Sequence, residues 1–220
     1  RQEGADDAAD AIHSVRGNTG ILDAAKLPIP DYDLWEDFDR FLFYNGVVYV
    51  IGNRGCPYSC TYCSEFPMRE RLPGRYLRVR DPAAYAREID HHWRKCGDRG
   101  MRVAHSFDPV FTSDRDWVTA FCDEYVRIGL ADELPFSCFS RADLLDEGKV
   151  RDLARANAKV VRIGIEAGNE AIRRDVYNKP ITDETYRRVF RMLHDHGIAV
   201  TGYNILGGPG ESKATLWDTF

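Results

Sequence analysis

The sequence has no long apolar run, no excess of positive charge and no apolar N-terminal segment. No uninterrupted apolar stretch approaches the ~20 residues that a membrane-spanning helix needs. The net charge of −5 gives no electrostatic basis for binding nucleic acid or an anionic membrane. The first residues are polar and acidic, without the apolar centre of a signal peptide. We therefore expect a protein that binds neither nucleic acid nor a membrane.

Cysteine is scarce, and half of it lies in one short loop. Six cysteines in 220 residues, three of them clustered, favour a reducing compartment such as the cytoplasm over a disulfide framework. Cys96, Cys122 and Cys138 fall in ordinary helix or strand patterns, where we expect them to be buried as small apolar side chains. The clustered three are therefore the chemically informative ones.

The clustered cysteines follow a predicted buried strand. Residues 47–51 are apolar and mostly β-branched, and glycines then loosen the backbone. Cys56, Cys60 and Cys63 follow at the spacing C-x3-C-x2-C on the resulting flexible loop. Thiolates held so close together must share a positive centre, because otherwise they would repel one another.

The number of clustered cysteines distinguishes between kinds of metal centre. A structural zinc site usually takes four protein ligands in two spaced pairs. A cubane iron–sulfur cluster has four irons, each of which needs a ligand. Three cysteines would leave one iron of such a cluster open to a small molecule. The alternatives are a zinc site that recruits a distant fourth ligand, or three unrelated thiols.

The rest of the chain alternates between apolar strands and amphipathic helices. With 44% hydrophobic residues, the chain can build one sizeable core. Continuous apolar strands between amphipathic helices predict an α/β fold with a parallel sheet covered by helices. Ser113 and Thr182 are candidate N-caps of two of these helices. The predicted strands span residues 47–51, 101–107, 134–140, 160–165 and 198–206.

Polar residues follow the predicted strands. They are Asp108 after the second strand, Arg141 after the third, Glu166 after the fourth, and a glycine-rich turn at residues 207–211 after the fifth. Sites in parallel sheets and barrels lie at the carboxyl ends of the strands, so we expect these residues to converge with the cysteines. His105, within the second strand, could face the interior of a barrel, but no histidine is assigned to a metal.

The cysteine loop resembles the signature of the radical S-adenosylmethionine (radical SAM) enzymes. In that family C-x3-C-x2-C follows the first strand, and an aromatic residue, here Tyr62, precedes the last cysteine. The resemblance, which spans roughly residues 28 to 211, implies a partial (β/α)6 TIM-like barrel. We expect the chain to be a fragment that contains five strands of this barrel.

The resemblance also implies the cofactors and the chemistry. Cys56, Cys60 and Cys63 would bind a [4Fe–4S] cluster, whose fourth iron chelates the amino and carboxylate groups of S-adenosylmethionine (SAM). An electron from the reduced cluster would cleave SAM to a 5′-deoxyadenosyl radical, which abstracts hydrogen from a substrate. No catalytic residue is assigned beyond the cluster ligands.

Three SAM contacts are implied near the first three strands. Tyr62 would lie near the adenine, with a packing aromatic as the alternative. Asp108 would receive the SAM amino group, since an ammonium needs an acceptor or an anion, unless this residue merely starts a helix. Arg141 would hold the SAM carboxylate by two parallel hydrogen bonds, or instead form a surface ion pair.

Three further contacts are implied after the fourth and fifth strands. Residues 164–168 resemble the family segment G-x-E-S-G, so Glu166 would accept the ribose hydroxyls or the SAM amino group, or else form a structural ion pair. In the segment 204–211, Ile205 would pack on the adenine, and Gly207 would let the backbone approach it. An ordinary β/α turn is the alternative for this last segment.

The segments look most like the radical SAM subgroup that contains a cobalamin (B12)-binding domain. Residues 1–45 would form a linker or arm after an absent N-terminal cobalamin-binding domain. Residues 46–220 would form a radical SAM core that is incomplete at its C-terminus. The cobalamin signature D-x-H-x-x-G is not found in the 220 residues, so cobalamin is left open.

The implied function is cobalamin-dependent methyl transfer to, or rearrangement of, a small-molecule or natural-product substrate. An electron donor such as flavodoxin or ferredoxin would be required. One alternative is a cobalamin-independent radical SAM methylthiotransferase or oxidoreductase. Another is an iron–sulfur or zinc protein that transfers electrons or stabilises structure without SAM chemistry, which would need a fourth protein ligand.

Overall fold

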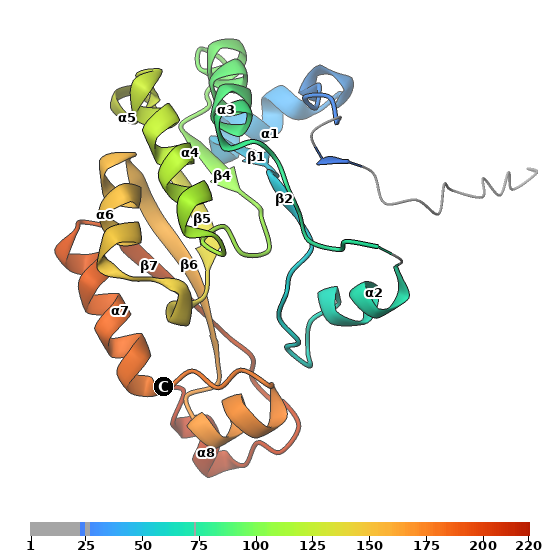
Figure 1. Cartoon of the computed structure of the whole chain (residues 1–220), viewed down its shortest axis with the longest axis vertical. Helices are drawn as coiled ribbons and strands as arrows, with labels where there is room; N and C mark the ends of the chain where they lie inside the picture. The colour runs from blue at the N-terminus through green and yellow to red at the C-terminus, as the bar shows by residue number, and fades with distance from the viewer. Residues whose placement is uncertain (1–22, 25–26, 73) are drawn as a thin grey trace, which may run out of the picture.

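The computed structural model describes residues 23–24, 27–72 and 74–220 (Figure 1). Most of the predicted linker, residues 1–22, therefore lies outside the described residues. A parallel sheet with strand order β1-β4-β5-β6-β7 forms the centre of the described chain. Because successive strands of this sheet run in the same direction, their carboxyl ends all lie at one edge.

The strands of this sheet correspond to those predicted from the sequence. They are β1 (Val47–Val50), β4 (Val103–Ser106), β5 (Phe136–Ser140), β6 (Ala158–Glu166) and β7 (Ala199–Asn204). All neighbouring pairs are parallel, which confirms the predicted α/β class. A small antiparallel pair, β2 (Asn53–Arg54) and β3 (Arg78–Val79), was not predicted.

The long helices cover one face of the sheet, whereas the short helices α2 (Glu65–Arg71) and α8 (Lys213–Trp217) lie away from it (Figure 1). The long ones are α3 (Pro82–Cys96), α4 (Arg115–Arg127), α6 (Glu147–Arg155) and α7 (Asp183–Asp195). The other short ones are α1 (Phe38–Asn45) and α5 (Leu130–Glu133), with a π-helical turn at Ile172–Val176. The N-cap of α7 is Thr182, as predicted. The prediction of Ser113 for α4 was wrong by one residue, because the side chain that accepts the capping hydrogen bond belongs to Asp114.

Side chains alternate between the two faces of the sheet. On the helix-covered face, Val48, Ala104 and Phe136 occupy matching positions on adjacent strands and belong to the buried core. On the opposite face, Tyr49 pairs with His105, and Tyr49 is 43% exposed. One face therefore forms the core, while the other is only partly covered within the described residues.

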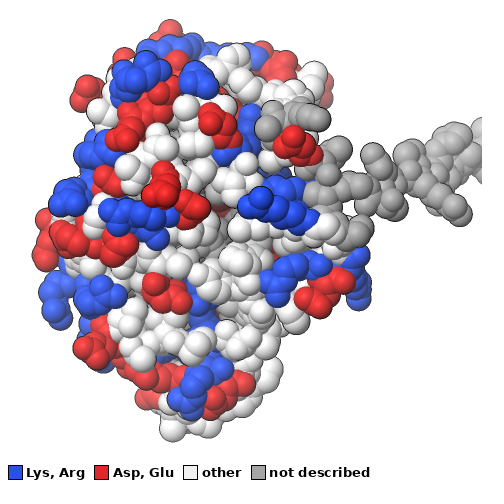
Figure 2. All heavy atoms as spheres, in the orientation of Figure 1, with Lys and Arg blue, Asp and Glu red and all other residues white. Residues whose placement is uncertain are grey.

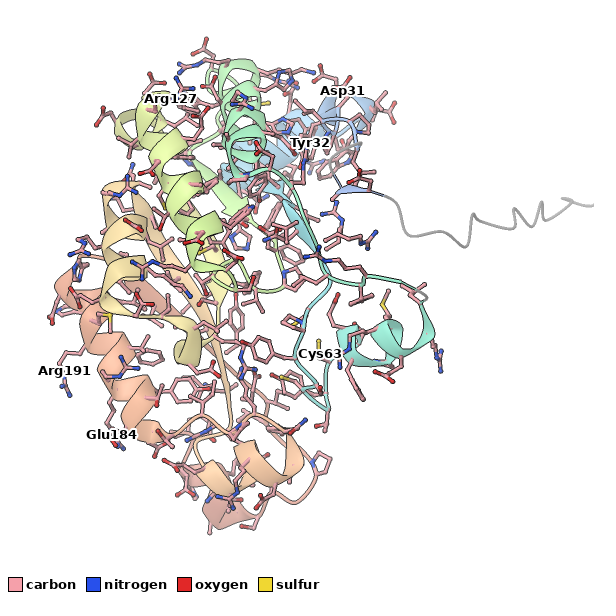
Figure 3. The ribbon with its side chains drawn as sticks, viewed as in Figure 1. Asp31, Tyr32, Cys63, Arg127, Glu184 and Arg191 are labelled. Carbon is pink, nitrogen blue, oxygen red and sulfur yellow. The ribbon has the colours of Figure 1, made fainter. Side chains whose placement is uncertain are left out.

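The described part of the predicted arm packs against the core and contains a helix that was not predicted. In α1, Phe38 and Leu42 are buried. Tyr32, which precedes this helix, stacks on Phe38 with ring centroids 4.8 Å apart. Asp31 accepts a hydrogen bond of 2.7 Å from Lys95 of α3, which ties the arm to the helix layer (Figure 3).

The described chain has no candidate membrane-spanning helix, and one of its faces has charges of mixed sign (Figure 2). No helix among these residues is long and apolar enough to cross a bilayer. On the face shown in Figure 2, acidic and basic side chains are interspersed rather than gathered by sign. This face therefore presents no continuous positive surface to a polyanion.

A buried arginine ties the end of β6 to the start of α7. Arg173 lies in the π-helical turn and is 1% exposed. Its guanidinium donates to the carbonyl oxygens of Ala167, Gly168 and Ile181 and pairs with the carboxylate of Asp183. The buried charge is thus hydrogen-bonded in several directions, which is the condition under which such a charge is tolerated.

Replacing Arg173 should destabilise the fold. Arg173→Met would leave three carbonyls and a carboxylate without their donor, so we expect the free energy of unfolding to fall by about 3 kcal/mol or more. The neighbouring Arg174→Met is a matched control, because Arg174 is exposed and pairs only with the exposed Asp175. It should change stability by no more than ~0.5 kcal/mol. Urea unfolding of both variants tests this, and equal effects would contradict the assigned role of Arg173.

Candidate functional site

The cysteine loop is shaped by an arginine from outside it. Residues 55–64 connect β2 to α2 without regular secondary structure. Arg69 of α2 donates hydrogen bonds to the carbonyl oxygens of Pro57 at 2.6 Å, Tyr58 at 3.4 Å and Cys56 at 3.5 Å. Because these carbonyls follow one another, a single guanidinium fixes the curvature of the loop around the cysteines.

The segment after the π-helical turn anchors the same loop from the other side. Thr61 donates from its backbone N–H to the carbonyl of Tyr177 at 3.2 Å and from its hydroxyl to that of Val176 at 2.6 Å. The side-chain amide of Asn178 donates to the carbonyl of Ser59 at 3.0 Å. Each of these hydrogen bonds joins two residues that are more than 100 positions apart in sequence, so the position of the loop depends on the tertiary fold.

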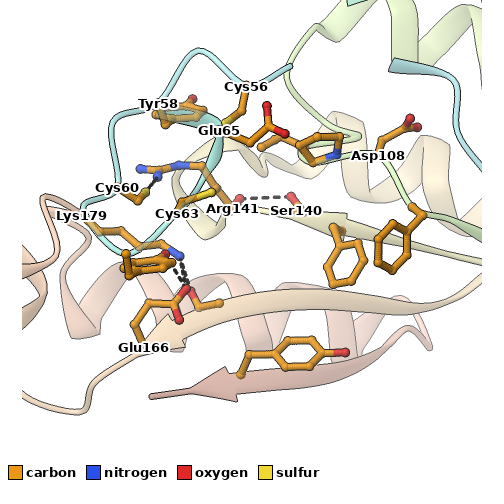
Figure 4. A pocket seen from close by; sticks show the side chains of 17 residues that line it. Cys56, Tyr58, Cys60, Cys63, Glu65, Asp108, Ser140, Arg141, Glu166 and Lys179 are labelled. Carbon is orange, nitrogen blue, oxygen red and sulfur yellow. Dashed lines mark hydrogen bonds and ion pairs between the residues drawn. The ribbon is translucent and has the colours of Figure 1, made fainter. Parts of the chain in front are cut away.

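A cavity of about 400 Å³ lies beside the cysteine loop at the carboxyl ends of β4, β5 and β6 (Figure 4). Its volume is within the range of small-molecule sites. The predicted residues that line it are Cys56, Cys60, Cys63, Tyr62, Asp108, Arg141 and Glu166. The lining residues that were not predicted are Tyr58, Glu65, Phe107, Pro109, Val110, Phe139, Ser140, Gly164, Lys179 and Tyr203. The structure therefore brings the cysteines and the strand-end residues together.

Asp108 is a buried carboxylate and does not cap a helix. One oxygen accepts a hydrogen bond of 2.5 Å from the backbone N–H of Asn53, and the other accepts one of 2.6 Å from the hydroxyl of Ser106. Burial raises the pKa of the Asp108 carboxyl to about 6, although the bonds from Ser106, Asn53 and Gly52 oppose the rise. The helix-start alternative is wrong, because α4 begins after Asp114.

Arg141 lies against the cysteine loop, but part of its hydrogen-bonding capacity is already used. Its Nε and Nη2 donate to the two carboxylate oxygens of Asp143 at 3.0 and 2.9 Å. Its Nη1 lies 3.5 Å from Cys60 Sγ, and the guanidinium sits 3.7 Å from the centre of the Tyr58 ring. Arg141 was predicted to make two parallel hydrogen bonds to the SAM carboxylate, but here it makes them to the carboxylate of Asp143. In this ion pair the arginine side chain is buried and the aspartate side chain is more exposed.

Glu166 forms an ion pair at the end of β6. Its Oε1 accepts hydrogen bonds from Lys179 Nζ at 2.9 Å and from the Tyr62 hydroxyl at 2.7 Å. Lys179 also donates to the carbonyl of Gly164 at 2.7 Å. Burial and the Glu166 carboxylate raise the pKa of the Tyr62 phenol, which therefore stays protonated. The contact links the cysteine loop to the sheet, and it matches the ion-pair alternative considered for Glu166.

Ile205 and Gly207 lie beyond the cavity rather than in its lining. Ile205 donates its backbone N–H to the carbonyl of Glu166 at 2.8 Å, and its side chain packs with Tyr177. Gly207 has a φ of +76° and donates its N–H to Glu211 at 2.6 Å. The glycine is therefore explained by the turn conformation, and both adenine contacts stay predictions.

Four of the lining residues that sequence reasoning missed illustrate two different cases. Phe107, Phe139 and Tyr203 lie near the carboxyl ends of β4, β5 and β7, where alternation of side chains could have placed them on the cavity side. Lys179 lies in a connection without periodicity, so nothing in its sequence neighbourhood points to Glu166. Its role is visible only in the folded chain.

The donor set fits an iron–sulfur cluster. The three loop cysteines line one cavity and form no disulfide. Among the described residues, no three His, Cys, Asp or Glu side chains form a site for one metal ion. In a cluster each thiolate binds its own iron, so the sulfur atoms need not meet at one point. Three thiols on one loop meet that requirement.

The raised pKa of Asp108 predicts a pH dependence of stability. The folded-state pKa of about 6 exceeds the ordinary value of 3.8, so the folded chain binds this proton more tightly than the unfolded chain. The resulting stabilisation is complete below the unfolded-state pKa and is lost as pH rises through about 6. Relative to Asp108→Asn, whose side chain does not titrate, the free energy of unfolding of the wild type should fall by about 3 kcal/mol at most.

Urea unfolding of the wild type and Asp108→Asn between about pH 4 and pH 7 measures this difference. We expect the wild type to lose stability relative to the variant as pH increases. Parallel pH profiles of the two proteins would show that Asp108 has an ordinary pKa in the fold.

Known proteins resemble this chain in sequence and in fold. Anaerobic magnesium-protoporphyrin IX monomethyl ester cyclase of Cereibacter sphaeroides is 29% identical over 180 residues, which are 80% of this chain and 28% of the cyclase. Bacteriochlorophyllide d C-12(1)-methyltransferase of Chlorobaculum tepidum is 21% identical over 210 residues, which are 95% of this chain and 44% of that enzyme. The chain thus spans less than half the length of these relatives.

The fold has solved counterparts. The structure of the cobalamin-dependent S-adenosylmethionine radical enzyme OxsB, with aqua-cobalamin and S-adenosylmethionine bound, superposes with a TM-score of 0.74. It is 18% identical, and the match covers 91% of this chain and 29% of OxsB. This likeness confirms the predicted partial barrel as the fold. Residues 50–220 also match the model of the radical SAM superfamily, and the chain therefore belongs to this superfamily, whose cofactors are a [4Fe–4S] cluster and SAM.

Proposed function

We propose that Cys56, Cys60 and Cys63 bind a [4Fe–4S] cluster and that the protein cleaves SAM reductively to a 5′-deoxyadenosyl radical. The observation that supports this most strongly is the meeting of three free thiols at one cavity, at the carboxyl edge of a parallel sheet. When bound, the cluster supplies the electron that breaks the sulfonium bond. The protein's own residues hold the cysteine loop in place, orient SAM and limit the access of water to the cavity.

The loop contacts suit the binding of a cluster. Arg69 and Asn178 hold the backbone before Cys60, and the contact of Thr61 with Val176 holds it after Cys60. The loop is therefore supported by atoms other than the sulfur atoms. Cys56 and Cys60 are each only 9% exposed, which keeps bulk water away from these sulfur atoms. Arg141 Nη1 lies 3.5 Å from Cys60 Sγ, so a positive charge adjoins one of the proposed cluster ligands.

The SAM contacts are proposals of unequal support. Glu166 is favoured for the ribose hydroxyls or the amino group, because its Oε2 makes no hydrogen bond to another described residue. Asp108 also lines the cavity, although both of its oxygens already accept hydrogen bonds. Arg141 would have to release Asp143 before it could bind the SAM carboxylate through two parallel hydrogen bonds. Tyr62 would flank the adenine from the loop.

We further propose that the complete protein modifies a small molecule by methyl transfer or by ring formation. The names of the relatives support both reactions, since one is a methyltransferase and the other a cyclase. The fold of the cobalamin-dependent OxsB supports cobalamin as a further cofactor. A cobalamin-binding domain would precede the arm at residues 1–45, and residues 46–220 would form the incomplete radical SAM core. The electron would come from a donor such as flavodoxin or ferredoxin.

Removing any cluster ligand should abolish the chemistry. We expect Cys56→Ala, Cys60→Ala or Cys63→Ala to lose cluster iron and sulfide after anaerobic reconstitution, and to produce no 5′-deoxyadenosine from SAM. Iron and sulfide analysis and mass spectrometry measure the two outcomes. Cys96→Ala is the matched control, because Cys96 is completely buried in the core and does not line the cavity. It should keep the cluster and lose only stability. Continued 5′-deoxyadenosine formation by a loop variant would refute the proposal.

A further inference from the structure

The partly covered face of the sheet carries a continuous row of aromatic rings. We call this row the aromatic wall and define it by Tyr49, His105, Phe107, Phe139 and Tyr203. The ring centroids of Tyr49 and His105 are 5.4 Å apart, those of His105 and Phe139 are 5.1 Å apart, and those of Phe139 and Tyr203 are 6.0 Å apart. Phe107 meets Phe139 edge to face at 5.5 Å. The wall therefore crosses the sheet from β1 to β7.

Three rings of the aromatic wall are exposed to solvent, whereas His105 is buried, and the wall adjoins the cavity beside the cysteine loop. Tyr49 on the edge strand β1 is 43% exposed, Tyr203 on the edge strand β7 is 39% exposed, and Phe107 just after β4 is 51% exposed. Phe107, Phe139 and Tyr203 line the cavity that also contains the three cysteines. From Tyr49 to Tyr203 the wall crosses four strand spacings of about 4.8 Å, which gives a width of roughly 19 Å. That width exceeds a single aromatic ring several-fold.

A cation without an acidic partner projects from the same face. Arg162 of β6 pairs in register with Phe139, so both side chains lie on the wall side of the sheet. Its Nη1 donates to the Tyr203 hydroxyl at 3.0 Å. Its Nε is buried without a hydrogen-bond acceptor, and no described carboxylate forms an ion pair with it.

The cations that line the adjoining cavity differ from Arg162 in this respect. Arg141 is paired with Asp143, and Lys179 is paired with Glu166. His105 contributes no charge near neutral pH, because burial and the nearby Arg162 lower the pKa of its imidazole to about 4. The positive charge at the wall therefore belongs to Arg162, and within the described residues nothing acidic compensates it.

We propose that the substrate is an extended planar conjugated molecule that packs on the aromatic wall and places a carboxylate against Arg162. Flat π surfaces pack favourably on exposed aromatic rings. A guanidinium that retains unused donors is the usual partner of a carboxylate, and the charge assistance strengthens each hydrogen bond. This inference rests on the proposed function, because the wall serves a substrate only if the adjoining cavity performs radical chemistry.

The test measures binding of two probes that differ only in charge. Protoporphyrin IX is planar and carries two carboxylates, whereas its dimethyl ester has the same ring without them. Binding to the cluster-loaded, full-length protein is followed by porphyrin fluorescence anisotropy. We expect Arg162→Gln to weaken binding of protoporphyrin IX at least tenfold and to leave binding of the dimethyl ester unchanged. Phe107→Leu should weaken binding of both probes several-fold, since it removes a flat surface and no charge.

Arg191→Gln is the matched control, because Arg191 points outward from α7 (Figure 3). It should change binding of neither probe. The inference is overturned if the wild type binds neither probe, or if Arg162→Gln and Arg191→Gln have equal effects. It is also overturned if the remainder of the full-length chain covers the wall, since Phe107→Leu would then have no effect.

Cleavage of SAM by the wild-type protein is measured in the same samples without probe. Formation of 5′-deoxyadenosine together with no probe binding would refute the substrate inference and leave the proposed function standing. Binding of the probe through Arg162 without any cleavage of SAM would refute the proposed function, and the wall would then be a binding surface without an assigned substrate.

Discussion

The candidate site depends on how the cysteine loop is held in place by the rest of the fold. The loop has no regular secondary structure, so its carbonyl groups must find donors elsewhere. Arg69 supplies them from α2, and Asn178 supplies another from the segment after the π-helical turn. The buried Arg173 holds this π-helical turn in place, because it binds both the end of β6 and the start of α7. The position of the thiols is thus a property of the whole sheet-and-helix assembly.

The same arrangement determines the electrostatics of the cavity. Most charged side chains at its rim neutralise one another in local pairs, such as Lys179 with Glu166 and Arg141 with Asp143. Local pairing lets a partly buried cavity contain many charges at a modest free-energy cost. Arg141 adjoins a cysteine sulfur, and Arg162 adjoins the aromatic wall. The first therefore suits the cluster side of the cavity and the second the substrate side.

Much of this organisation follows from the sequence, because it depends on local patterns. The apolar strands, the spacing of the cysteines and the rule that sites lie at carboxyl strand ends were enough to predict that Asp108, Arg141 and Glu166 meet Cys60 at one cavity. Pattern reasoning also located the residues on the correct elements, since strand periodicity is strong in a buried parallel sheet.

The sequence did not predict side-chain contacts between residues that are distant in the chain, because tertiary packing determines them. The pairing of Lys179 with Glu166 and the support of the loop by Arg69 require distances that no spacing rule supplies. Ile205 and Gly207 were predicted near the adenine from a motif, and these contacts stay predictions: neither residue is in the cavity lining, and Gly207 belongs to a tight turn closed by Glu211. Helix α1 was missed because the prolines before it suggested an extended arm.

The central claim is that SAM binds the iron that has no cysteine ligand. Electron paramagnetic resonance of the reduced, cluster-loaded protein tests this most directly. The account predicts that saturating SAM changes the spectrum of the reduced cluster, because a new ligand enters the coordination sphere of one iron. A spectrum that stays the same at saturating SAM would contradict the claim and would favour a cluster that only transfers electrons.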